Sequence, residues 1–174
     1  MYLLKGKQLS TTMVEQQNTN TMETTEKSID VLNDLIEINN DRVAGFEKAA
    51  KDLGEGDLEL SGIFNQYAQE SRDYSTELSA AVRESGAEAE TGSSATGAIH
   101  RAWLDVKATF TGHDRKSILA ECERGEDAIK KAYRSALESG DNELPFEVSD
   151  IIRRQQQGIQ AAHDRIKALR DSAA

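Results

Sequence analysis

Hydrophobic residues recur at spacings of three and four along four stretches of the chain, at about 26–53, 58–84, 115–139 and 145–170. This spacing gathers the apolar side chains on one face of an α-helix. The composition agrees, because Ala, Leu, Glu and Lys are frequent and the chain holds only one proline. The pattern therefore predicts an all-α fold of four amphipathic helices.

Each of the four stretches carries a polar residue on its apolar face, near its middle. These residues are Asn39, Ser71, Glu126 and Gln155. A polar group on a buried face is costly unless it finds a partner. Counted along the helices at about 1.5 Å per residue, the four lie within about one turn of one another, which predicts a single polar layer across a bundle. Glu126 is the only charge on its stripe, and we expect it to pair with Asn39, Gln155 or a tyrosine hydroxyl.

The connections between the stretches differ in length, and this difference predicts the topology. The links after residues 53 and 139 are short, so each pair of helices should be antiparallel. The link between 85 and 114 is long and contains a stripe typical of a short helix ending at Phe110, with Trp103 at its middle. Such a crossover predicts a ferritin-like four-helix bundle whose second and third long helices are parallel. We expect Trp103 to pack over Gly125.

Residues 1–23 differ from the rest of the chain because they are rich in Thr, Gln, Asn and Ser and show no apolar periodicity. Such a segment buries too little apolar surface to offset the entropy lost on ordering. We therefore expect a disordered N-terminal segment, 1–23, followed by one bundle domain, 24–172. Met22 is a candidate translation start.

Charge and cysteine content narrow the possible partners. The net charge is −10 and the pI about 4.8, which disfavours nucleic acid and anionic membranes as partners. A single cysteine, Cys122, excludes an intramolecular disulfide framework, and no apolar run reaches the length of a membrane span. We expect a cytoplasmic protein with Cys122 as a buried apolar filler. No phosphate-binding loop, dinucleotide fingerprint or nucleophile elbow is present, so no residue is assigned a catalytic role.

Three segments resemble a family of small bacterial ferritin-like four-helix-bundle proteins of unknown function. They are residues 26–36 (EKSIDVLNDLI), 100–105 (HRAWLD) and 120–127 (AECERGED), the last followed by Tyr133. The ECERGED string is the most specific of them, and the resemblance extends over about residues 23–172. It implies the ferritin-like fold and a bacterial, cytoplasmic setting, and it implies no reaction.

Two hypotheses about function follow. The first is a non-catalytic bundle without a cofactor, stress-related in role, that acts as a homo-oligomer or with another protein partner. Its polar layer would then be structural. The second is a ferritin-like protein that binds or oxidises iron or manganese through Glu47, Glu70, Glu126 and His163.

The ligand pattern favours the first hypothesis. Di-metal bundles use a Glu-x-x-His pair from each of two helices, and here the residue three before His163 is Gln160. Glu47 and His163 also lie nearer one end than Glu126 does, where a second, looser cluster with Glu123 is expected.

Overall fold

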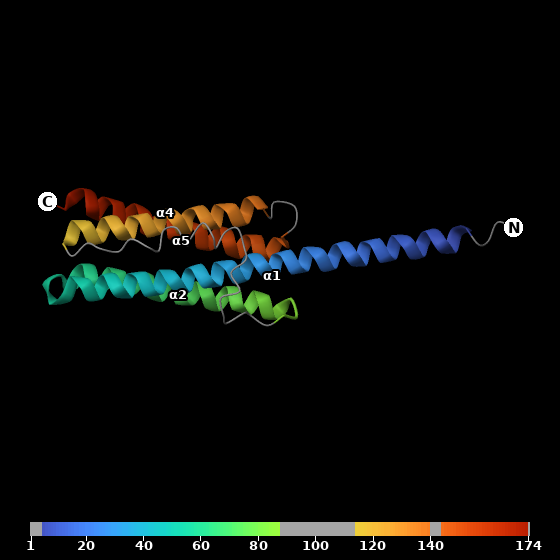
Figure 1. Cartoon of the computed structure of the whole chain (residues 1–174), viewed down its shortest axis with the longest axis horizontal. Helices are drawn as coiled ribbons and strands as arrows, with labels where there is room; N and C mark the ends of the chain where they lie inside the picture. Colours follow the sequence, from blue (N-terminus) through green and yellow to red (C-terminus); the bar gives the residue numbers. More distant parts are fainter. Residues whose placement is uncertain (1–4, 88–113, 140–143, 174) are drawn as a thin grey trace.

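The computed structural model describes residues 5–87, 114–139 and 144–173, with side chains from Glu26 onward. Its elements are the helices α1 (Lys5–Leu53), α2 (Leu58–Glu84), α4 (Arg115–Ser139) and α5 (Phe146–Ser172), with a 3-10 turn at Gly54–Gly56. The four helices form a bundle (Figure 1). The all-α prediction is confirmed.

The helix directions agree with a bundle that has one long crossover. α1 and α2 are antiparallel, as are α4 and α5, whereas α2 and α4 run the same way (Figure 1). Arg42 contacts Glu126, and Asn39, earlier on α1, contacts Tyr133, later on α4, so α1 and α4 are antiparallel. The predicted parallel arrangement of the second and third long helices is confirmed. The crossover itself, with the predicted short helix and Trp103, lies outside the described residues.

Local capping explains where the helices begin and end. Gly54 adopts a φ of 60°, a left-handed conformation that ends α1 at little steric cost. The Asp57 side chain accepts a hydrogen bond from the Leu60 backbone N–H at 3.0 Å, and Asp114 accepts one from the Ser117 N–H at 3.0 Å. Both aspartates are N-caps, a position that favours Asp because its carboxylate accepts from free backbone N–H groups.

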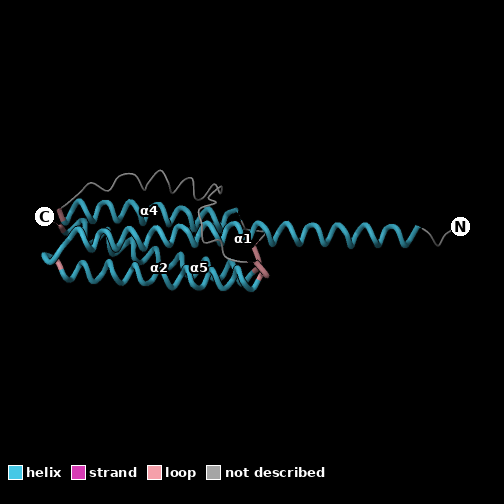
Figure 2. Tube along the Cα trace, turned by 60° about the horizontal axis from the view of Figure 1, so that its bottom comes forward, coloured by secondary structure: helices cyan, strands magenta, loops and turns pink. Residues whose placement is uncertain are grey.

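The start of α1 differs from the prediction. The helix begins at Lys5 rather than near Glu26, and its first part extends past the ends of the other described helices (Figures 1 and 2). No glycine or proline occurs between residues 7 and 44, and extending an existing helix costs far less than nucleating one. The expected start at Glu26 is therefore wrong. The domain boundary near residue 24 and the disorder expected of residues 1–23 stay predictions.

The core consists of two apolar clusters at different heights along the bundle. The first is mainly aliphatic and includes Leu35 and Ile129, and the second includes the aromatic residues Phe46, Phe64 and Tyr67. Phe46 contacts both other rings, with centroids 5.6 and 5.4 Å away. No helix within the described ranges is long and apolar enough to cross a membrane.

Candidate functional site: a buried polar centre

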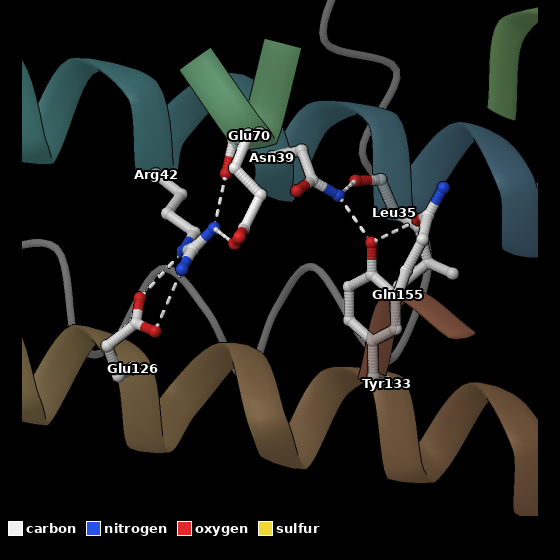
Figure 3. A network of polar contacts seen from close by, with 8 residues as sticks. Leu35, Asn39, Arg42, Glu70, Glu126, Tyr133 and Gln155 are labelled. Atoms are coloured by element: carbon white, nitrogen blue, oxygen red, sulfur yellow. Dashed lines mark hydrogen bonds and ion pairs between the residues drawn. The ribbon is translucent and has the colours of Figure 1, made fainter. Parts of the chain in front are cut away.

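Arg42 forms the centre of a buried ion-pair cluster between the two apolar clusters. It lies three residues after Asn39 and four before Phe46, so it shares the inward face of α1 and is only 3% exposed. Its Nε donates to Glu126 Oε1 at 2.6 Å and its Nη2 to Glu126 Oε2 at 3.0 Å. Its Nη1 donates to Glu70 Oε1 at 3.0 Å and to Ser71 Oγ at 2.8 Å. One guanidinium thus joins three helices (Figure 3).

Arg42 also stacks against the aromatic end of the core. Its guanidinium carbon lies 5.1 Å from the ring centroid of Phe46 and 5.7 Å from that of Tyr67. Cation–π contacts of this length are attractive, most strongly where water is excluded. The cation is therefore held by hydrogen bonds on one side and by aromatic rings on the other.

The charges of this cluster do not balance. Two carboxylates, Glu126 and Glu70, share one guanidinium, although Glu70 keeps a side chain that is 27% exposed. Burial raises the pKa of Glu126, an effect that Arg42 opposes and Glu70 reinforces. Burial alone would lower the pKa of Arg42, but Glu126 and Glu70 raise it above its ordinary value. Arg42 is thus a fixed positive charge, and the excess charge of the cluster is negative.

A second buried network surrounds the Tyr133 hydroxyl and is made mostly of neutral groups. Asn39 Nδ2 donates to this hydroxyl at 2.6 Å and to the Leu35 carbonyl at 2.8 Å. The hydroxyl donates to Gln155 Oε1 at 2.7 Å, and Gln155 Nε2 donates to Glu77 Oε2 at 2.8 Å near the surface. Burial raises the pKa of Tyr133, which stays neutral and able to donate.

The four residues predicted to form one layer are all buried, but they divide between the two networks. Ser71 and Glu126 meet at Arg42. Asn39 and Gln155 meet at Tyr133 (Figure 3). The predicted direct partners of Glu126 are therefore wrong, because Arg42 takes both of its oxygens. The Oδ1 atom of Asn39 has no hydrogen-bond partner among the described residues.

The structure does not bring the four predicted metal ligands together. Glu70 and Glu126 meet, but at Arg42 rather than at an open position. Glu47 is exposed and pairs with Arg72 on the surface. His163 lies on α5 beside Asp127. The looser cluster expected from Glu47, His163 and Glu123 does form in part, since Glu123, Asp127 and His163 lie close together without Glu47.

The chemistry available at the buried centre is limited. Arg42 carries a permanent charge and cannot act as a base. Cys122 is buried beside the Phe46 cluster, and burial raises the pKa of its thiol, so the reactive thiolate is disfavoured. The four hydrogen bonds of Arg42 tie α1, α2 and α4 together at this centre.

Arg42 and Tyr133 are the residues on which the centre depends, and sequence reasoning missed the role of both. Tyr133 continues the α4 stripe after Glu126 and Ile129, in steps of three and four, but this spacing does not reveal the bonds of its hydroxyl. Arg42 occurs at a position of the α1 stripe that continues Leu35 and Asn39 in steps of four and three. This spacing, together with a glutamate on the apolar stripe of a facing helix, is the signal that could have revealed Arg42.

Comparison with known protein families gives a match. Residues 27–139 match a family model described as "Domain of unknown function (DUF2383)". No protein among the curated ones matches the chain.

Proposed function

Because the matched residues 27–139 make up more than half of the chain, it belongs to the DUF2383 family of unknown function, and we propose that it is a non-catalytic helical bundle that acts by self-association. We also propose that the protein acts in the cytoplasm. The proposal has two parts, a closed centre and a helical extension, and each rests on a different region.

The single observation that carries the proposal is the position of Arg42. In a ferritin-like metal protein, carboxylates from several helices converge on a cation in the middle of the bundle. Here the guanidinium of Arg42 lies between Glu126 and Glu70 and takes that role. A metal at this position would have to displace a buried positive charge that is tied by four hydrogen bonds. The iron or manganese alternative therefore has less support.

Self-association is supported by the first part of α1, which extends past the other described helices (Figure 2). A helix without tertiary packing is marginal in water, so this part gains most from a partner helix. By sequence, residues 5–25 carry two lysines and two glutamates, whereas the whole chain has a net charge of −10. The net charge of the chain therefore does not oppose contact between two copies along this segment.

Sedimentation equilibrium of the full chain and of a chain shortened to begin at Met22 tests this proposal. We expect a concentration-dependent dimer for the full chain and a monomer for the shortened one. At concentrations where both are monomeric, their melting temperatures should agree within about 2 °C, because the shortened chain keeps the core. The same association state for the two chains, whether both are monomers or both dimers, would overturn association through this segment.

A further inference from the structure

A histidine and two carboxylates converge on the α4–α5 face, away from the Arg42 centre. Glu123 and Asp127 are four residues apart on α4, so they share one face of that helix. His163 approaches them from α5. One possible ligand atom of each residue lies within 4.8 Å of the others. We propose that Glu123, Asp127 and His163 bind one divalent transition-metal ion of the Zn²⁺ type, independently of the function proposed above.

The imidazole of His163 is held in the way that metal-binding histidines are held. The ring is buried, with Nδ1 at 3.0 Å from Asp164 Oδ1 and Nε2 at 2.9 Å from Asp127 Oδ1. Asp164 Oδ1 also accepts from Gln160 Nε2 at 2.8 Å, which fixes the carboxylate. A carboxylate that accepts from one ring nitrogen orients the other toward a metal.

The two carboxylate contacts of His163 also leave a position for a cation. Either a second ring proton or a metal ion can lie between Nε2 and the Asp127 oxygen. When the ring carries a single proton on Nδ1, directed to Asp164, Nε2 offers a lone pair and Asp127 an anionic oxygen to the same metal ion. Tetrahedral ligands of Zn²⁺ lie roughly 3.3 Å apart, and the exposed Asp127 side chain can move to reach that separation.

Arg170 is the competitor at this site. Its Nη1 contacts Glu123 Oε2, so a metal must share Glu123 with a guanidinium or displace it. Displacement has a ready path, because Arg170 Nη2 is already 2.6 Å from Asp171 Oδ1 and its side chain is 30% exposed. The arginine can therefore leave Glu123 without losing all of its partners, and it sets an upper limit on metal affinity.

The ligand set selects the class of metal. One imidazole nitrogen and two carboxylate oxygens suit Zn²⁺ and its transition-metal neighbours, whereas Mg²⁺ and Ca²⁺ prefer ligands that are all oxygen. The ion would join α4 to α5 and would stabilise the folded chain in proportion to the logarithm of its concentration.

Isothermal titration of the full chain with Zn²⁺ tests the site. We expect one ion bound per chain, at least about ten-fold weaker binding in Asp127→Asn, and tighter binding in Arg170→Gln. Asp127 is exposed, so its substitution leaves the core intact. Glu138→Gln is the matched control, because it removes an exposed carboxylate elsewhere on α4 and should leave binding unchanged.

Imidazole ¹⁵N chemical shifts provide a second, local measurement. Added Zn²⁺ should move the Nε2 signal of His163 in the wild type, and the shift should be lost in Asp127→Asn. Absence of Zn²⁺ binding by the wild type would overturn the proposal. Binding that is equally tight in wild type and Asp127→Asn would do so as well, because the ion would then be held elsewhere.

Discussion

The Arg42 half and the Tyr133 half of the buried centre satisfy their polar atoms in different ways. In the Arg42 half, formal charges face one another between two apolar clusters. In the Tyr133 half, an amide, a phenol and a second amide form a chain that lies within the first cluster and reaches charge only at Glu77. Loss of one member therefore has different consequences in the two halves.

The difference follows from what each residue leaves behind. Without Arg42, two carboxylates stay near each other in a medium of low dielectric constant, and neither has another cation in the cluster. Without the Tyr133 hydroxyl, neutral amide groups lose one hydrogen bond each. Breaking a buried ion pair costs more than removing a neutral hydrogen bond. The charged half should therefore dominate the energetics of the centre, although it joins only α1, α2 and α4, whereas the Tyr133 half also includes α5.

The largest expected effect comes from Arg42→Met, which keeps an unbranched side chain but removes the charge. It should lower the free energy of unfolding by about 3 to 5 kcal/mol, because Glu126 and Glu70 are left unpaired. Urea denaturation followed by circular dichroism measures this. Arg72→Met is the control, since Arg72 pairs with Glu47 on the surface, and it should cost less than about 1 kcal/mol. Equal costs for the two variants would remove the distinction between buried and exposed pairs.

Tyr133→Phe should have the next largest effect. It keeps the ring in the core but leaves Gln155 Oε1 without its donor and Asn39 Nδ2 with only the Leu35 carbonyl. We expect the free energy of unfolding to fall by about 1 to 3 kcal/mol, less than for Arg42→Met. The same denaturation experiment checks it. A cost greater than that of Arg42→Met would reverse the order of the two halves.

Gly158, three residues after Gln155 on α5, lies next to the Tyr133 half of the buried centre. A Cβ atom at this position would clash with the Tyr74 hydroxyl, so the absence of a side chain makes room for Tyr74 of α2 against α5. At Gly62 a Cβ would meet nothing within 4 Å. Gly62→Ala should stabilise the protein by about 1 kcal/mol through helix propensity, and Gly158→Ala should not. An equal gain in thermal denaturation at both sites would show that Tyr74 moves aside freely.

The smallest effect is expected for Glu126→Gln at neutral pH, where the free energy of unfolding should change by less than about 1 kcal/mol. The change leaves Arg42 paired with Glu70 and removes the excess negative charge of the cluster. The raised pKa of Glu126 fixes the sign of the pH dependence. Its stabilising contribution is complete below the ordinary pKa of a glutamate, 4.5, and is lost as pH rises through the raised value. The wild type should therefore gain stability relative to the variant as pH falls through this range. A gain in the opposite direction, measured by denaturation across pH, would show that pairing outweighs burial at Glu126.

Much of the fold was predictable because it depends on spacing and loop length. The stripes located four helices, and the long link before Arg115 predicted the parallel pair. The start of α1 was not predictable in this way, because its first part has no apolar stripe and continues a helix nucleated elsewhere.

The candidate site was predictable only in part. Polar residues on an apolar stripe can be recognised, so Asn39, Ser71, Glu126 and Gln155 were found. Their pairing depends on side-chain length and direction, which a count of residues along the helix axis does not contain. Arg42 was missed because a long cationic side chain usually places its charge in water. Glu47 was wrongly grouped with Glu126 because it lies at the margin of the stripe and turns toward Arg72.

A double-mutant cycle between Arg42 and Glu126 tests the central claim most directly, namely that Arg42 is the resident cation of the buried carboxylates. The free energy of unfolding would be measured for the wild type, Arg42→Met, Glu126→Gln and the double variant. If the claim holds, Glu126→Gln recovers part of the loss caused by Arg42→Met, with a coupling of about 1 to 3 kcal/mol, because it neutralises one of the stranded carboxylates. Costs that simply add, or an Arg42→Met variant as stable as the wild type, would contradict the account.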